Sequence, residues 1–182
     1  MTEPMAQLRM GFSRFDDLPR PHVPEGYALR TFREGDEDGW LSVLGTGGWD
    51  AWDRGRLDAL LGGGYGVVPR DGVVFATRDE RIVGAACMTL HGGEMRTAAE
   101  IGWVVVDTAH RGRGLARAIV LAMLGLIHER GYRYAFLRTE PFRVPAIKLY
   151  LDVGFEPEMV DARHPAWWNA FREDMDAGSS RQ

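Results

Sequence analysis

The stretch "LARAIVLAMLGLIHER", residues 115–130, limits most strongly what this chain can fold into. Read as a helix, it carries apolar residues on nearly every face, and Gly131 follows it as a C-terminal cap. Such a helix is stable only when other elements cover it on most sides. It is also shorter than the roughly 20 apolar residues that a membrane span requires. The sequence therefore predicts a globular domain built around a buried helix.

Segments with strand character lie on both sides of this helix. "AAEIGWVVVD" precedes it and "YRYAFLRTE" follows it, so residues 99–138 predict a strand–helix–strand unit with a parallel crossover. Gly102 inside the first strand indicates a bulge or a close approach of another group to the backbone. Further strands are expected at "YALRTF", at "GVVFATRDE" and "RIVGAACMTL", which form a hairpin at Asp79-Glu80, and at "FEPEMV". We expect an α/β (α+β) fold with a mixed, mostly antiparallel sheet flanked by helices.

Shorter helices and the chain ends complete the predicted organisation. Asp36 is placed to cap a helix with an acidic first turn, and a short helix is expected near residues 52–61. Pro145 and Gly154 delimit another helix. Prolines near the start indicate an extended segment, so regular structure is expected to begin at Tyr27. The predicted division is an extended N-terminal leader over residues 1–26, a domain over residues 27–160, and a C-terminal helix and tail over residues 161–182.

Length and composition narrow the function classes. The 182 residues suffice for one domain with a sizeable core, and the net charge of -4 argues against a nucleic-acid partner. The N-terminus lacks a basic start followed by an apolar stretch, so a cytoplasmic protein with no membrane partner is expected. The single cysteine, Cys87, is interpreted as a small buried residue rather than a nucleophile. The five histidines show no ligand spacing, so no metal is predicted.

The turn "RGRGLA", which joins the strand ending near Val106 to the buried helix, has the composition of an anion site. Backbone N–H groups in the first turn of a helix lack carbonyl partners, and their partial charge attracts anions. Gly112 and Gly114 would let a phosphate approach the backbone closely, and Arg111 and Arg113 add positive charge. A plain strand-to-helix turn with solvated arginines is the alternative. The stretch matches neither the phosphate loop of nucleoside triphosphatases nor the dinucleotide-binding fingerprint.

The turn and its setting resemble the GNAT superfamily of acyl-CoA N-acyltransferases. "RGRGLA" matches the R/Q-x-x-G-x-G/A pyrophosphate signature, and "AEIGWVVVDTAHRGRGLARAIV" around it is similar to the family's fourth strand, loop and third helix. "AIKLYLDVGFEP" is similar to the family's A-x-x-L-Y-x-x-x-G-F segment. The resemblance extends from about residue 27 to residue 160. It implies a sheet splayed between its fourth and fifth strands, with acetyl-CoA bound in the gap as a co-substrate.

The resemblance also implies coenzyme contacts. The strand before the turn would pair its backbone with the pantetheine arm, and a buried strand of valines is compatible with that role. The amides of the turn would hold the pyrophosphate. Arg143 stands where the family often has an asparagine, and it would either reach a CoA phosphate or point to solvent. The implied coenzyme-binding residues are Val104, Val105, Val106, Arg111, Gly112, Arg113, Gly114, Leu115, Ala116 and Arg143.

Two residues are implied in proton transfer. Tyr150 falls where the family often has a tyrosine that protonates the departing CoA thiolate, and an ordinary phenol has a pKa of ~10. A buried aromatic ring on a short helix is the alternative. Glu100 falls where some members have a glutamate that takes a proton from the amine, directly or through water. A strand-end residue in solvent is the alternative there, and no covalent acyl-enzyme is required.

The chain departs from the family pattern at its end. The family usually finishes with a hairpin of two strands, whereas here "FEPEMV" is followed by "RHPAWWNAF", which predicts an amphipathic helix. The last strand of the sheet is therefore missing or comes from elsewhere in the chain. The leader segment "QLRMGFSRF" is a candidate source.

The predicted function is transfer of an acetyl group from acetyl-CoA to a primary amine by direct attack in a ternary complex. A non-catalytic acyl-CoA sensor and a turn that binds another phosphorylated ligand stay open as alternatives. The resemblance implies that the acceptor, a small molecule or a peptide, lies between the early helices and the C-terminal strands, at "GTGGWDAWDR", at His91 and at "HPAWW". In the first of these segments, Trp49 and Trp52 with Asp50 and Asp53 would cage an ammonium. Ordinary packing of at least one tryptophan is the alternative, and a homodimer is left open.

Overall fold

Within residues 7–47, 52–64, 66–92 and 97–179, which the computed structural model describes, seven strands form one sheet. Its order is β2-β3-β4-β5-β6-β1-β7, and all neighbours are antiparallel except β5 and β6, which are parallel. The predicted α/β class with a mostly antiparallel sheet is confirmed. The strands are β1 (Leu8–Phe12), β2 (Ala28–Thr31), β3 (Val73–Arg78), β4 (Arg81–Leu90), β5 (Ala98–Val106), β6 (Tyr134–Thr139) and β7 (Glu156–Glu158).

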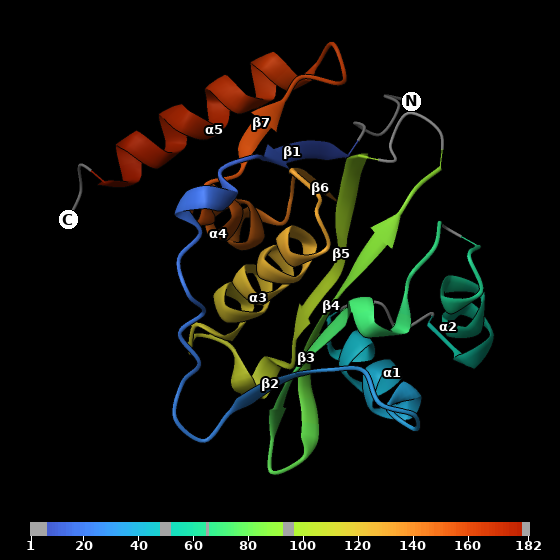
Figure 1. The fold of residues 1–182 in the computed structure, drawn as a ribbon. Helices are drawn as coiled ribbons and strands as arrows, with labels where there is room; N and C mark the ends of the chain where they lie inside the picture. Colours follow the sequence, from blue (N-terminus) through green and yellow to red (C-terminus); the bar gives the residue numbers. More distant parts are fainter. Residues whose placement is uncertain (1–6, 48–51, 65, 93–96, 180–182) are drawn as a thin grey trace.

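Helices cover both faces of this sheet (Figure 1). Two helices and α5 pack on one face, and two others pack on the opposite face, so the core has two halves. The first half contains α3 and α4, and the second contains α1 and α2. The helices are α1 (Glu37–Thr46), α2 (Arg54–Leu61), α3 (Leu115–Glu129), α4 (Val144–Val153) and α5 (His164–Ser179), with short 3-10 turns η1 (Phe15–Asp17), η2 (Arg70–Gly72) and η4 (Thr108–His110).

Helix α3 is the buried element that its apolar faces predict. It crosses β3, β4 and β5, and its residues Ile119, Val120, Met123, Leu124 and Ile127 are fully buried. Burial of one such side chain stabilises the fold by about 1.5–3 kcal/mol, so this helix is a main source of core stability. In the described part of the chain, no helix is long and apolar enough to cross a membrane.

Strands β5 and β6 are paired over only part of their length. The parallel register joins Ala98 to Tyr134 and ends where Glu100 meets Phe136. Beyond that point β5 continues to Val106, while β6 is paired with β1 on its other side. These are the fourth and fifth strands in sheet order, so the predicted splay is confirmed.

The N-terminal segment contributes a strand inside the sheet. Strand β1 lies between β6 and β7, with Met10 opposite Leu137 on one side and Pro157 on the other. The expectation that regular structure begins at Tyr27 is wrong, because the outer edge of β6 needs a hydrogen-bonding partner and β1 supplies it. The suggestion that the leader provides the missing strand is confirmed. Its apolar side chains, Leu8, Met10 and Phe12, are buried in the core.

The β3–β4 hairpin has the turn that the sequence predicts, whereas the predicted cap of α1 does not form. The β3–β4 hairpin turns at Asp79 and Glu80, which adopt φ of 50° and 64°, as expected for a two-residue turn. Asp36 occupies the position before α1, but its carboxylate does not cap the helix. It accepts hydrogen bonds from Arg30 at 2.6 and 2.7 Å and from the Arg33 backbone N–H instead. A guanidinium fork is a stronger partner than a single backbone amide.

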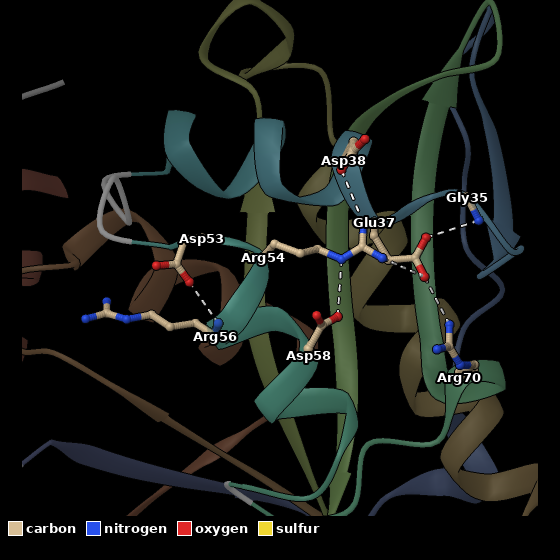
Figure 2. Close-up of polar contacts among 8 residues, drawn as sticks. All are labelled: Gly35, Glu37, Asp38, Asp53, Arg54, Arg56, Asp58 and Arg70. Atoms are coloured by element: carbon tan, nitrogen blue, oxygen red, sulfur yellow. Dashed lines mark hydrogen bonds and ion pairs between the residues drawn. The ribbon is translucent and has the colours of Figure 1, made fainter.

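A polar network ties α1 to α2 and to η2. Figure 2 shows the buried Glu37 carboxylate of α1, which accepts from Arg70 at 3.2 Å and from the Gly35 backbone N–H at 3.1 Å. Arg54 of α2 lies 3.8 Å from the same carboxylate and also pairs with Asp58 at 3.2 Å. The network therefore fixes α2 to α1, the helix that packs on β4 and β5.

Candidate functional site

A cavity of ≈ 590 Å³ opens beside the C-terminal half of β5, where that strand has separated from β6. We call it the splay cavity. Its wall comes from the end of β5, the turn before α3, the first residues of α3 and one face of α4. The lining residues are Gly47, Val104, Val105, Val106, His110, Arg111, Gly112, Gly114, Leu115, Ala116, Arg117, Arg143, Pro145, Ala146, Leu149 and Tyr150.

The turn before α3 has the geometry of an anion-binding site. Gly112 and Gly114 adopt φ of 73° and 81°, which non-glycine residues rarely do, and open space surrounds the position of an added Cβ at each. Gly114 is also the residue before α3, so no side chain caps the first backbone N–H groups of the helix. These donors and the helix dipole favour a bound anion at this point. The turn therefore fits the pyrophosphate of a coenzyme.

The two arginines of the turn differ in what they do. Arg111 donates through Nε to the Val106 carbonyl at 3.0 Å and through a terminal nitrogen to the Thr46 carbonyl at 3.1 Å. It therefore joins the end of β5 to the end of α1, so much of its donor capacity is already used. Arg113 is exposed and does not line the splay cavity, unlike the other implied coenzyme-binding residues.

The end of β5 contributes backbone groups, and no charged side chains, to the wall of the splay cavity. Val104, Val105 and Val106 line the splay cavity beyond the last β5–β6 pair. On the other side, β5 pairs with β4 through a bulge, where Val105 opposite Ala85 is followed by Gly102 opposite Cys87. The bulge near Gly102 is confirmed. A strand edge that has left its neighbour can hydrogen-bond an extended ligand carrying amide groups.

Tyr150 reaches the same cavity from α4 and is 6% exposed. Burial raises the pKa of its phenol well above the usual range, the nearby Arg143 guanidinium lowers it and Glu140 raises it. The hydroxyl group is therefore neutral and retains its proton at ordinary pH. Arg143 itself donates to Glu140 at 2.7 Å while lining the cavity, so it does not simply point to solvent.

Glu100 lies outside the splay cavity, on the paired part of β5, and is buried. Its carboxylate accepts from Arg138 at 2.8 and 2.9 Å, and one of its oxygens lies 2.6 Å from His91 Nε2. We call these three residues the Glu100 cluster. The carboxylate is not a strand-end group in solvent. Its two partners come from β6 and from the residue after β4, and neither was predicted to contact it.

The residues proposed for the acceptor side divide between described and undescribed parts of the chain. Trp49 and Asp50 lie outside the described residues. Trp52 packs edge to face on Trp103 with ring centroids 4.4 Å apart, and the Asp53 carboxylate caps α2 by accepting from the Arg56 backbone N–H at 2.9 Å. Trp52 therefore packs against another ring, as the alternative expected for at least one tryptophan, and the four-residue ammonium cage stays a prediction.

Cys87 and the histidines complete the predicted set. Cys87 is fully buried, as expected, and burial raises the pKa of its thiol well above the usual range, so it is a poor nucleophile. His110 lines the splay cavity and contacts the Tyr27 hydroxyl at 2.9 Å through Nδ1. No group of metal-binding side chains occurs among the residues that the structure describes.

Sequence reasoning missed several residues that line the splay cavity. Pro145, Ala146 and Leu149 share one face of α4 with Tyr150. The spacings of four residues between Ala146 and Tyr150 and between Pro145 and Leu149 were a usable signal. Gly47 had no such signal, because it reaches the cavity only through the packing of α1 against β4 and β5.

Comparison with protein families and curated proteins gives one consistent group. Residues 29–155 match the model of the "Acetyltransferase (GNAT) family". A mycothiol acetyltransferase from Thermobispora bispora is 31% identical over 176 residues, which cover 90% of this chain and 58% of that protein. One from Thermomonospora curvata is 31% identical, covering 81% of this chain and 50% of that protein. The chain thus spans between half and three fifths of the length of these two relatives.

Solved structures show the same fold. A GCN5-related N-acetyltransferase from Sphaerobacter thermophilus has a TM-score of 0.61 and 24% identity, covering 86% of this chain and 50% of that chain. A tandem GNAT protein from the clavulanic acid biosynthesis pathway has a TM-score of 0.64 and 21% identity, covering 86% and 51%. At this level of identity the likeness concerns the fold alone.

Proposed function

The chain belongs to the GNAT acetyltransferase family, and on that premise we propose that it transfers an acetyl group from acetyl-CoA to a primary amine within a ternary complex. The observation that carries the proposal is the composition of the splay cavity. The free part of β5, the glycine turn before α3 and the phenol of Tyr150 all line one space. These features match, respectively, an extended amide-containing arm, a diphosphate and a thiolate leaving group.

Binding residues would position the coenzyme, which when bound supplies a thioester that an amine can attack. The backbone of Val104–Val106 would pair with the pantetheine amides, and N–H donors of this edge would support the charge that develops on the thioester oxygen. The N–H groups around Gly112 and Gly114 would hold the diphosphate. Arg143 would add positive charge at the α4 side of the cavity.

Proton transfer completes the proposed reaction. The amine nitrogen forms a bond to the acyl carbon, the carbon–sulfur bond breaks, the nitrogen loses a proton and the sulfur gains one. Tyr150 would donate the proton to sulfur, because its protonated hydroxyl group lines the same cavity. Burial raises the pKa of this phenol and so opposes the transfer, and the nearby Arg143 guanidinium offsets part of that effect. Glu100 is the proposed acceptor of the amine proton, directly or through water. Glu100 lies outside the splay cavity, which favours the route through water.

We also propose a small-molecule amine as the acceptor. The support is the similarity to mycothiol acetyltransferases, whose name specifies a small molecule. Transfer does not need an acyl-enzyme, since the thiol of Cys87 is buried and protonated. A catalytic domain over residues 27–160 and a cytoplasmic location remain part of the proposal, with β1 as an added strand of that domain.

The experiment that tests the proposal follows release of the CoA thiol from acetyl-CoA in the presence of a panel of small primary amines. Amine-dependent release, with the N-acetylated product identified by mass, is the expected result. Binding of acetyl-CoA without turnover of any amine on a broad panel would contradict it.

A further inference from the structure

The bulge in β5 places the consecutive residues Gly102 and Trp103 on the same face of the sheet. Between the pairs Cys87–Gly102 and Ala85–Val105, Trp103 and Val104 together oppose a single residue of β4. Trp103 adopts φ of 55°, an uncommon conformation for a bulky side chain. Its ring packs with the core half on the α1 and α2 side, the same side as Cys87. Gly102 and Trp103 therefore both face that side.

Gly102 leaves a hollow on this face. Its φ is not in the left-handed region, so the backbone does not require glycine at this position. Among the described atoms, an added Cβ would meet only Cys87 Sγ and Thr89 Oγ1, both at 4.0 Å. Gly102 is also partly exposed, although it lies in a central strand. A glycine in a strand that neither backbone nor neighbours demand indicates that another group approaches there.

Two different walls flank the hollow along β5. On one side stands the Glu100 cluster. Arg138 donates to Glu100 through Nε and one terminal nitrogen, and Glu100 does not accept from the other terminal nitrogen. The Arg138 side chain is half-exposed. On the other side stands the Trp52–Trp103 pair. The Glu100 cluster offers N–H donors of Arg138, while the negative charge of Glu100 is already paired. The Trp52–Trp103 pair offers an aromatic surface.

We propose that Gly102 is the floor of the acceptor subsite, and that the subsite selects monoamines with an apolar or flat body and a carbonyl, hydroxyl or carboxylate oxygen near the amine. The inference rests on the proposed function, since it places the amine two residues along β5 from Val104. The tryptophan pair packs on the body, and Arg138 donates to the oxygen. A polyamine is disfavoured, because its further ammonium groups would lie near the Arg138 guanidinium.

The test compares Gly102→Val with Gly125→Val, a matched control in α3, where an added Cβ also meets open space. Phenylalanine amide serves as the acceptor. Gly102→Val should lower kcat/KM for this amine at least tenfold while the Kd for acetyl-CoA stays within twofold, and Gly125→Val should change neither. If Gly102→Val melts too early to be assayed, Gly102→Ala carries the test with a smaller loss, because its Cβ makes only ordinary contacts.

Substrate choice provides the second arm. Wild-type protein should show a kcat/KM at least tenfold higher for phenylalanine amide than for spermidine. An unchanged kcat/KM in Gly102→Val, an equal loss of acetyl-CoA affinity, a preference for spermidine or a failure to acetylate phenylalanine amide would each overturn the inference. If the wild-type protein does not bind acetyl-CoA, that result would instead overturn the proposed function.

Discussion

The splay cavity and the Glu100 cluster lie on the same strand, yet they are built in different ways. The cavity is made of consecutive residues in β5, the turn and α3, together with one face of α4. It offers a ligand mainly backbone groups, which the conformations of Gly112 and Gly114 leave accessible. The Glu100 cluster joins β5 to β6 and to the residue after β4 through side chains alone.

This difference separates the part of the site that would bind a common coenzyme from the part that would bind a particular amine. Backbone and glycine recognition depends little on the identity of neighbouring side chains. Side-chain recognition changes with every substitution in the cluster. We therefore expect variants at the two regions to separate coenzyme affinity from amine turnover, and the following predictions are ordered by the size of the expected effect.

The largest effect is expected at Tyr150, in the splay cavity. Tyr150→Phe removes the proton donor and keeps the ring, so kcat should fall by about 10²–10⁴ with little change in the Kd for acetyl-CoA. Steady-state kinetics and calorimetry measure the two quantities. Equal losses of affinity and turnover would mean that Tyr150 only shapes the cavity.

Glu100→Gln should lower kcat by about 10² and leave acetyl-CoA affinity unchanged. The substitution also removes the charge that Arg138 and His91 contact, so the free energy of unfolding should fall by about 1–3 kcal/mol. Arg138→Gln is the control, since it weakens the same cluster and keeps the carboxylate. The two variants are compared by kcat, because loss of the proposed contact between Arg138 and the acceptor should raise KM. If both variants lose stability but retain full turnover, Glu100 has a structural role only.

Gly114→Val tests the turn before α3 against the other end of the same helix. Gly114 has φ of 81° and Gly131 has φ of 86°, so valine at either position should cost about 1–2 kcal/mol of stability. Only Gly114→Val should weaken acetyl-CoA binding, by about tenfold, or 1.4 kcal/mol. A similar loss of affinity in Gly131→Val would show that the effect comes from helix stability rather than from the turn.

The smallest effect is expected in the network of Figure 2. Hydrogen bonding by its own backbone N–H lowers the pKa of Glu37, and although burial opposes this, Arg70, Arg54 and the Gly35 N–H lower it further. The stabilisation is then present above the unfolded-state pKa of about 4.3 and is lost as the pH falls through the lower folded-state pKa.

Glu37→Gln should therefore reduce stability by about 1 kcal/mol at pH 7, and the difference from wild type should shrink below about pH 4. Urea denaturation at several pH values measures it. A difference that grows on acidification would contradict the assigned direction.

The sequence predicted the elements whose cause is local and missed those whose cause is distant. The conformations of Gly112 and Gly114, the buried α3 and the hairpin at Asp79 each follow from a few adjacent residues. Strand β1 was raised only as a candidate, because its five residues carry little pattern and its position depends on the free edge of β6. Its partner residues lie at the other end of the chain.

Side chains that face one another across strands were the least predictable. Nothing near Glu100 in the sequence indicates Arg138, because their contact depends on the short parallel register between β5 and β6. The Trp52–Trp103 contact depends likewise on the bulge, which tilts Trp103 toward α2. The coenzyme side could therefore be inferred from motifs, whereas the acceptor side required the fold.

The most direct measurement is a thermal melt with acetyl-CoA, CoA and ATP, each at a hundred times a plausible Kd, on wild-type protein and Gly114→Val. One-site linkage predicts about 2.7 kcal/mol of stabilisation, which is a rise of roughly 5–10 °C for a domain of this size. We expect that rise in the wild-type protein with acetyl-CoA and CoA but not with ATP, and a smaller one in Gly114→Val. No rise with acetyl-CoA, or an equal rise with ATP, would contradict the assignment of the splay cavity to the coenzyme.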